Sequence, residues 1–142
     1  RRPFEVPKFG ITILGSSHGF DPNGATTGLV IWVNGNGIMV DPPPGSSMAL
    51  EKLSIPPRLI KGIILTHCHA DHDAGTFQKI LKEQQVKLFT TETIFKSFMR
   101  KYSAISGFGP DFLTQLFVFC PVKIGVPMEF GGAKFNFYYS FH

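Results

Sequence analysis

Short apolar runs that end at turn residues open the chain, and they predict β-strands at residues 11–14, 28–33 and 38–40. The last two runs flank an Asn-Gly-Asn-Gly sequence at 34–37, which is typical of a tight β-hairpin. Asp41 follows directly and leads into three consecutive prolines, which lack the N–H groups that a strand ladder needs. The N-terminal part is therefore predicted to be β-rich, with Asp41 at the end of a strand.

The middle of the chain alternates strand and helix patterns, as α/β proteins do. Residues 60–66 are almost continuously aliphatic or β-branched, which favours a strand buried on both faces, and residues 86–90 predict another strand. Helical patterns are found at residues 47–53, 73–85, 93–105 and 109–116. In the second of these helices, Lys79 falls on the predicted polar face.

A Gly-Gly turn at 131–132 precedes a final strand whose side chains alternate in character. The aromatic residues on one face are Phe135, Phe137, Tyr139 and Phe141, and His142 belongs to the other face. Alternating aromatic residues in a strand are usually core, so this face is predicted to be packed and not to stack on nucleic-acid bases.

Composition restricts the class of protein. With 142 residues, of which 43% are hydrophobic, the chain is expected to fold as one domain, and no apolar run is long enough to cross a bilayer. Two cysteines exclude a disulfide framework, so a soluble, cytoplasmic protein is the expectation. The net charge of +4 suits a small anionic partner such as a phosphoester. Because no initiator Met precedes Arg1, the chain is expected to be an internal stretch of a longer product.

The strongest chemical signal is the run Thr-His-Cys-His-Ala-Asp-His directly after the buried strand. In extended backbone His67 and His69 project to the same side and can bind one ion, while Cys68 turns the other way and is predicted to be a core thiol. Asp71 and His72 follow at the turn into the next helix. Imidazole and carboxylate ligands suit zinc, manganese or iron, so the run predicts a divalent metal site with room for a second ion.

This motif resembles that of the metallo-β-lactamase superfamily, in which His-x-His-x-Asp-His follows a β-strand. Residues 13–17, the hairpin leading to Asp41 and the Thr66-His67 junction resemble its ribonuclease Z and phosphodiesterase branch. The resemblance covers residues 11–142 and implies an α/β fold, the N-terminal half of a four-layer αβ/βα sandwich. Residues 1–142 are therefore expected to be a single metallo-β-lactamase-like domain that lacks its C-terminal half.

The resemblance also implies a ligand set. His67 and His69 would bind the first metal, Asp71 and His72 the second, and His142 would complete the first site. Two zinc ions are expected if the site is complete, with manganese or iron as alternatives.

Asp41 resembles the superfamily's strand-end acid, which supports the metal ligands from behind them and fixes a histidine's orientation. The Pro-rich loop after it departs from the usual acid-small-Gly turn, so the fit of a substrate beside this loop is not predicted.

The function implied by the resemblance is a metal-dependent phosphodiesterase that acts on a nucleotide or RNA through a metal-bound hydroxide, with Asp71 orienting the water or taking its proton. One alternative keeps the metals but acts on a thioester, lactone or β-lactam. Another is a non-catalytic metal-binding half-domain. A homodimer in which a second chain supplies the missing ligands is a further alternative.

Overall fold

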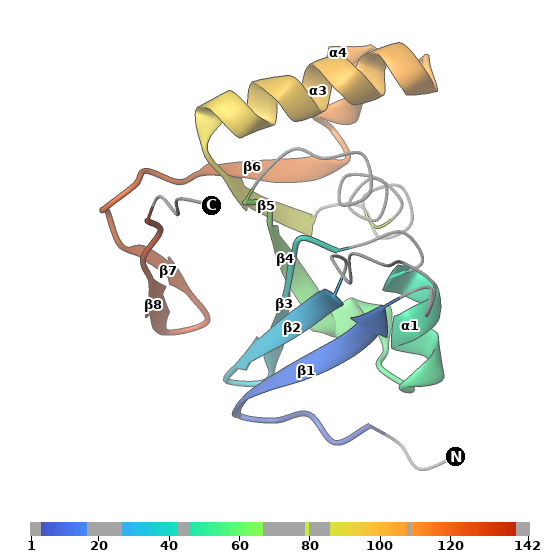
Figure 1. Ribbon diagram of the computed structural model, residues 1–142, viewed down its shortest axis with the longest axis vertical. Coiled ribbons are helices and arrows are strands. Elements are labelled where there is room, and N and C mark those ends of the chain that lie inside the picture. The colour runs from blue at the N-terminus through green and yellow to red at the C-terminus, as the bar shows by residue number, and fades with distance from the viewer. Residues whose placement is uncertain are drawn as a thin grey trace.

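The structure is a computed structural model that describes residues 4–16, 27–42, 46–66, 79, 86–107 and 109–138 (Figure 1). In this part of the chain six strands form one sheet in sequence order. They are β1 (Phe9–Ser16), β2 (Thr27–Val33), β3 (Asn36–Val40), β4 (Ile60–Ile64), β5 (Val86–Thr90) and β6 (Phe117–Pro121). Strands β1 to β3 pair antiparallel, and β3 to β6 pair parallel.

The four parallel strands end on the same side of the sheet, which we call the carboxyl edge. It is formed by the ends of β3, β4, β5 and β6, at Val40, Ile64, Thr90 and Pro121. In open α/β sheets ligands bind beyond the carboxyl ends of parallel strands. A functional site is therefore expected at the carboxyl edge.

The predicted hairpin is confirmed, with a tighter turn than the sequence suggested. Strand β3 begins at Asn36, so only Asn34 and Gly35 form the turn. Both have positive φ, 50° and 80°, the conformation that a two-residue hairpin turn requires and that Asn and Gly tolerate best.

The described part of the chain has short helices and one longer helix with a capping residue at each end. They are α1 (Ser46–Lys52), α3 (Glu92–Ser106) and α4 (Pro110–Leu113). The Thr91 hydroxyl accepts a hydrogen bond from Ile94 N–H at 3.3 Å and caps α3, which ends at Gly107 with φ 74°. The helix predicted at 93–105 is thus confirmed. Helix α4 stops at Leu113, short of the predicted 116, because the chain turns there to enter β6.

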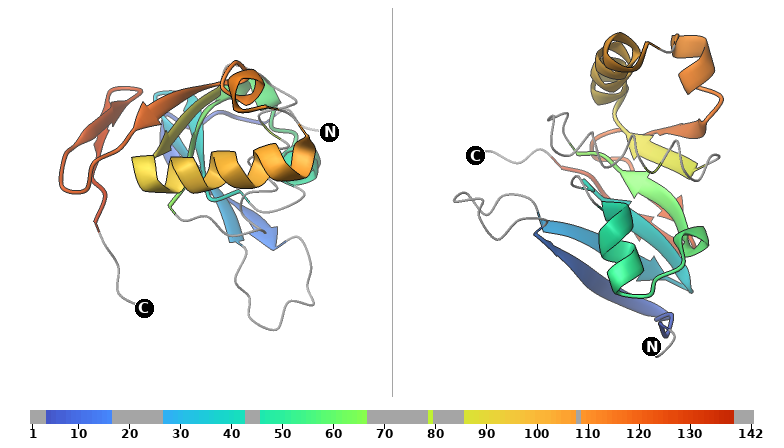
Figure 2. Two further views of the ribbon diagram at one scale, coloured as in Figure 1. Left: turned by 90° about the horizontal axis from the view of Figure 1, so that it is seen from above. Right: turned by 90° about the vertical axis from the view of Figure 1, so that its right-hand side faces the viewer.

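Strand β6 was not predicted, although its sequence is apolar throughout. It pairs with β5 along its whole length, from Val86↔Phe117 to Thr90↔Pro121. Helix α3 forms the crossover between these two parallel strands. Figure 2 shows α3 and α4 side by side beyond β6, at the opposite end of the sheet from β1.

Both faces of the sheet carry apolar clusters, because neighbouring residues of a strand point to opposite faces. On one face Trp32, Met39, Ile63 and Leu88 pack with helix residues such as Phe98. On the other face Ile38, Ile64 and Phe89 pack under a second hairpin, β7 (Met128–Phe130) and β8 (Ala133–Phe135). Figure 1 shows α1 and this hairpin on opposite sides of the central strands. Strand β4 is covered on both faces as predicted, except at Lys61, which is exposed, and the strand ends at Ile64, before the predicted Thr66.

The last predicted strand is shorter than expected. Strand β8 ends at Phe135, and residues 136–138 continue without strand pairing, yet the alternation persists. Phe135 and Phe137 pack against the second cluster, whereas Asn136 and Tyr138 are exposed. The prediction that the aromatic face is core is confirmed for these two phenylalanines. Tyr139, Phe141 and His142 lie outside the described residues.

Within the described residues, no helix has both the length and the apolar character needed to span a membrane.

Candidate functional site

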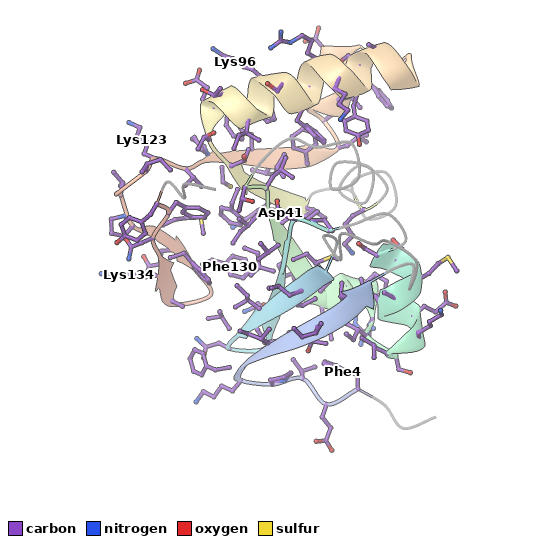
Figure 3. All side chains as sticks on the ribbon, viewed as in Figure 1. Phe4, Asp41, Lys96, Lys123, Phe130 and Lys134 are labelled. Atoms are coloured by element: carbon purple, nitrogen blue, oxygen red, sulfur yellow. The ribbon has the colours of Figure 1, made fainter. Side chains whose placement is uncertain are left out.

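Asp41 and Thr66 meet at the carboxyl edge of the sheet. Asp41 directly follows β3, and its N–H donates to the carbonyl of Ile64 at 2.9 Å, which holds it against the end of β4. Its Oδ1 accepts a hydrogen bond from the Thr66 N–H at 2.8 Å, and its Oδ2 accepts one from the Thr66 hydroxyl. Figure 3 labels Asp41 at the end of the central strands. One carboxylate therefore fixes both the main chain and the side chain of Thr66.

The backbone of Asp41 is itself unusual, with φ 42°. The left-handed region costs an ordinary L-residue about 1–2 kcal/mol, and Asp and Asn occupy it most readily after Gly. Such conformations persist where surrounding contacts determine them, and they cluster at functional sites. At Asp41 the determining contacts are the main-chain bond to Ile64 and the two bonds from Thr66.

Leu65 and Thr90 form the next layer of this edge. The Leu65 N–H donates to the Phe89 carbonyl at 3.0 Å, so the chain follows β5 one residue beyond the end of β4. The Thr90 hydroxyl donates to the Leu65 carbonyl at 2.7 Å. Leu65 and Thr90 are each only 1% exposed. Thr90 in turn accepts a hydrogen bond from Val122 N–H at 2.9 Å, which ties the far side of β5 to the residue after β6.

Most of the predicted ligands cannot be placed. His67, His69, Asp71, His72 and His142 lie outside the described residues, as does Cys68. Among the residues that are described, no group of three or more His, Cys, Asp or Glu could hold a metal ion. The ligand roles of the five residues therefore stay predictions. What the structure does place is Thr66, the residue bonded to His67, at the carboxyl edge.

The second hairpin leads toward the same edge. Its Gly-Gly turn is docked on the β2–β3 turn, where Asn34 Nδ2 donates to the Gly131 carbonyl at 2.6 Å. This is the end of β3 opposite to Asp41. Strand β8 starts from the docked turn and runs in the same direction as β3 in Figure 1. Strand β8 is therefore directed toward the edge that carries Asp41.

Lys79 corrects one expectation about the helix predicted at 73–85, most of which lies outside the described residues. Lys79 is in helical conformation but only 2% exposed, so its placement on the polar face was wrong. Its Nζ donates to the carbonyl of Pro57 at 3.1 Å. Pro57 opens a short 3₁₀ turn, η1 (Pro57–Leu59), directly before β4. A long aliphatic stem can be buried when its amine finds an acceptor, and periodicity gives no signal for this.

Cys120 is the one cysteine within the described residues. Burial raises the pKa of its thiol above the ordinary value of 9.0, and the charge of Lys87 opposes that rise. Cys120 also packs against the second cluster, under the hairpin. It is a packing residue and not part of the candidate site.

Two curated proteins of Dictyostelium discoideum are similar to this chain over almost its whole length. The cGMP-dependent 3′,5′-cGMP phosphodiesterase A is 58% identical over 139 residues, which are 98% of this chain and 16% of that protein. The cAMP/cGMP-dependent 3′,5′-cAMP/cGMP phosphodiesterase B is 46% identical over 143 residues, 99% of this chain and 13% of that protein. The chain therefore spans about a sixth or less of the length of these relatives.

Solved structures share the fold at low sequence identity. A diphosphatase of the PhnP family superposes with a TM-score of 0.63 at 20% identity, covering 89% of this chain and 54% of that one. The metallo-β-lactamase fold protein YhfI of Bacillus subtilis gives 0.61 at 17% identity, covering 85% and 48%. Human tRNase Z, short form, gives 0.54 at 21% identity, covering 77% and 42%.

The predicted fold is thus confirmed as that of about half a metallo-β-lactamase fold protein. Residues 9–142 match a protein family described as Anti-Pycsar protein Apyc1. The match begins at the first residue of β1 and includes the hairpin, the carboxyl edge and the His-x-His-x-Asp-His run. The chain belongs to the Anti-Pycsar protein Apyc1 family and has the metallo-β-lactamase fold.

Proposed function

We propose that this chain is the metal-binding part of a phosphodiesterase that hydrolyses 3′,5′-cyclic nucleotides, with cGMP as its first substrate. The observation that carries the proposal is the 58% identity, over 98% of the chain, with a protein named as a 3′,5′-cGMP phosphodiesterase. A second relative, named for both cAMP and cGMP, supports cAMP as a further substrate. The net charge of +4 suits these anionic molecules.

The residues proposed to hold the metal are those of the His-x-His-x-Asp-His run. His67 and His69 would bind one divalent ion, Asp71 and His72 a second, and His142 would complete the first site. Imidazole nitrogens and carboxylate oxygens are a donor set that suits zinc, manganese or iron, and zinc is the ion proposed. The position of Thr66 at the carboxyl edge supports this placement, because it puts the start of the run where α/β sheets bind ligands.

Divalent ions bound there would supply Lewis acidity, which activates water at neutral pH and neutralises charge on the phosphoryl oxygens. The chain's own residues would then orient the reactants. The Asp71 carboxylate would hold the attacking water and accept its proton. Asp41 would keep the start of the ligand run in place by its two hydrogen bonds to Thr66.

Hydrolysis of a thioester, a lactone or a β-lactam would need the same metal ligands, so the motif alone does not separate these activities. Both curated relatives carry phosphodiesterase in their names, and this favours the phosphodiester. A metal-binding module without activity would share the fold and the metals but not the turnover. A direct assay separates three possibilities, which are hydrolysis of a phosphodiester, hydrolysis of a thioester, lactone or β-lactam, and metal binding without turnover.

The test is hydrolysis by the natural full-length protein, purified with zinc or manganese and assayed with cGMP, cAMP and an acyl thioester in parallel. We expect cGMP turnover that is abolished by a chelator and restored by added metal. Turnover of the thioester alone would overturn the phosphodiesterase assignment. Bound metal without turnover of any of the three would identify a non-catalytic metal-binding module.

A further inference from the structure

The peptide group between Leu65 and Thr66 is held at both of its polar atoms. Its carbonyl, that of Leu65, accepts the Thr90 hydroxyl at 2.7 Å. Its N–H, that of Thr66, donates to Asp41 Oδ1 at 2.8 Å. The two partners come from different strands, because Thr90 ends β5 and Asp41 follows β3. A peptide group bound on opposite sides by two strands cannot rotate without breaking one of these bonds.

Thr90 is also fixed from behind. It is 1% exposed, its own carbonyl accepts the Val122 N–H at 2.9 Å, and it pairs with Pro121 in the register of β5 and β6. The next residue, Thr91, serves a different purpose as the cap of α3. The hydroxyl of Thr90 is therefore presented by a rigid strand end and not by a loop. A hydrogen bond donated from a rigid strand end holds its acceptor in a well-defined position.

The held peptide lies immediately before the predicted metal ligands. Only Thr66 separates it from His67 in the sequence, so its orientation sets the direction in which the chain enters the His-x-His-x-Asp-His run. Groups that orient metal ligands without touching the metal typically change metal affinity by about 10- to 100-fold when removed. Asp41 belongs to this class by the superfamily resemblance. Nothing in the resemblance assigns Thr90.

We infer that Thr90 is a positioning residue for the metal site: its hydroxyl fixes the Leu65–Thr66 peptide from the side opposite to Asp41 and so raises metal affinity. The inference rests on the proposed function, because it presupposes that the run after Thr66 binds metal. Thr90 is 1% exposed, and its hydroxyl donates to a main-chain carbonyl. Its effect is exerted through the main chain.

Two pairs of variants isolate the hydroxyl in the natural full-length protein. Thr90→Val replaces the hydroxyl by a methyl group, and comparison of Thr90→Ser with Thr90→Ala isolates the hydroxyl in a smaller side chain if the Val variant does not fold. Thr12→Val is the matched control, because the Thr12 hydroxyl accepts a hydrogen bond from Trp32 Nε1 at 2.9 Å, on the antiparallel part of the sheet. Zinc affinity is measured by competition with a chromophoric chelator, and kcat and KM for cGMP are measured separately.

We expect Thr90→Val and Thr90→Ala to lower zinc affinity by about tenfold or more, with Thr90→Ser close to wild type and Thr12→Val unchanged. We also expect kcat at saturating zinc to fall less than zinc affinity does. If the wild-type protein binds zinc and Thr90→Val and Thr90→Ala bind it equally well, the inference is overturned and the proposed function stands. Equal loss in Ser and Ala would also overturn it. A wild-type protein that binds no zinc would overturn both.

Discussion

Both carboxylate oxygens of Asp41 accept hydrogen bonds from Thr66, a residue 25 positions later in the chain. The pair joins the ends of two parallel strands at the point where the predicted ligand run begins. Asp41 adopts a left-handed backbone conformation to make these bonds. The arrangement links a sequence feature, an acid before a Pro-rich loop, to the geometry of a candidate metal site.

The first prediction concerns the charge of Asp41. In Asp41→Asn the amide NH₂ replaces one acceptor oxygen, so the Thr66 hydroxyl must accept instead of donate and both bonds lose the carboxylate charge that strengthens them, while Asn tolerates the left-handed backbone as well as Asp does. We expect zinc affinity of the full-length protein to fall by about tenfold or more, measured by chelator competition. Asp111→Asn, the same change at an exposed position at the start of α4, should leave it unchanged. If Asp41→Asn binds zinc with the affinity of the wild-type protein, the Asp41–Thr66 pair does not support the metal site.

The second prediction concerns the buried amine of Lys79. Lys79→Met retains the aliphatic stem but leaves the Pro57 carbonyl without this donor. That carbonyl still accepts the Ile60 N–H, so the change removes one hydrogen bond, which contributes about 0.5–1.5 kcal/mol. We therefore expect faster hydrogen–deuterium exchange in β4 and the η1 turn, which a local loss of stability produces. Lys61→Met, on an exposed position of β4, is the control and should exchange as wild type does. Slower exchange in Lys79→Met would mean that the free energy of burying the amine is more unfavourable than its hydrogen bond is favourable.

The third prediction tests the packing of the second cluster. A Cβ at Gly62 would lie 2.8 Å from Phe89 Cε2, closer than side-chain atoms normally approach. The Phe89 ring cannot simply move away, since it packs edge-on against Phe130 with ring centroids 5.6 Å apart. Gly62→Ala should therefore destabilise this part of the fold by about 1–3 kcal/mol, seen as a lower melting temperature. Gly109→Ala is the matched control, because a Cβ there meets nothing within 4 Å. Equal melting temperatures would contradict the described packing.

The fourth prediction is a pH dependence at Cys120. Burial raises the pKa of this thiol, so the native protein holds it protonated at a pH where a free cysteine begins to ionise. Alkylation requires the thiolate, so Cys120 should be modified more slowly in the native protein than in urea. The stability contribution is complete below the ordinary pKa of 9.0 and is lost as the pH rises through the raised native value. Peptide mapping by mass spectrometry separates Cys120 from Cys68, and equal rates in both states would show that the thiol is not buried.

Local sequence patterns predicted the elements whose signals are local. The Asn34-Gly35 turn and the helix closed near Gly107 were readable because their residues favour the observed conformations by themselves. Strand β6 was missed because its five residues show no alternation of apolar and polar side chains. It forms a strand because it pairs with β5, from which α3 separates it in the sequence. Lys79 was misplaced because a helical pattern assigns every lysine to the polar face.

Some residues of the candidate site could be predicted from the sequence, and others could not. The His-x-His-x-Asp-His run and Asp41 are visible in the sequence because their chemistry is concentrated in few residue types. Thr90 is not, because its importance depends on which carbonyl its hydroxyl reaches, and that carbonyl is 25 residues away. A residue that acts only through the main chain carries no sequence signature of its own.

We propose that His67, His69, Asp71 and His72 build a metal site that serves phosphodiester hydrolysis. The most direct measurement is elemental analysis of the natural full-length protein and of its His69→Ala variant, with cGMP turnover measured on the same samples. On this proposal we expect about two divalent ions per chain and chelator-sensitive turnover in the wild-type protein, with metal content and turnover both reduced in His69→Ala. Turnover by a wild-type protein that contains no metal, or full metal content in His69→Ala, would contradict it.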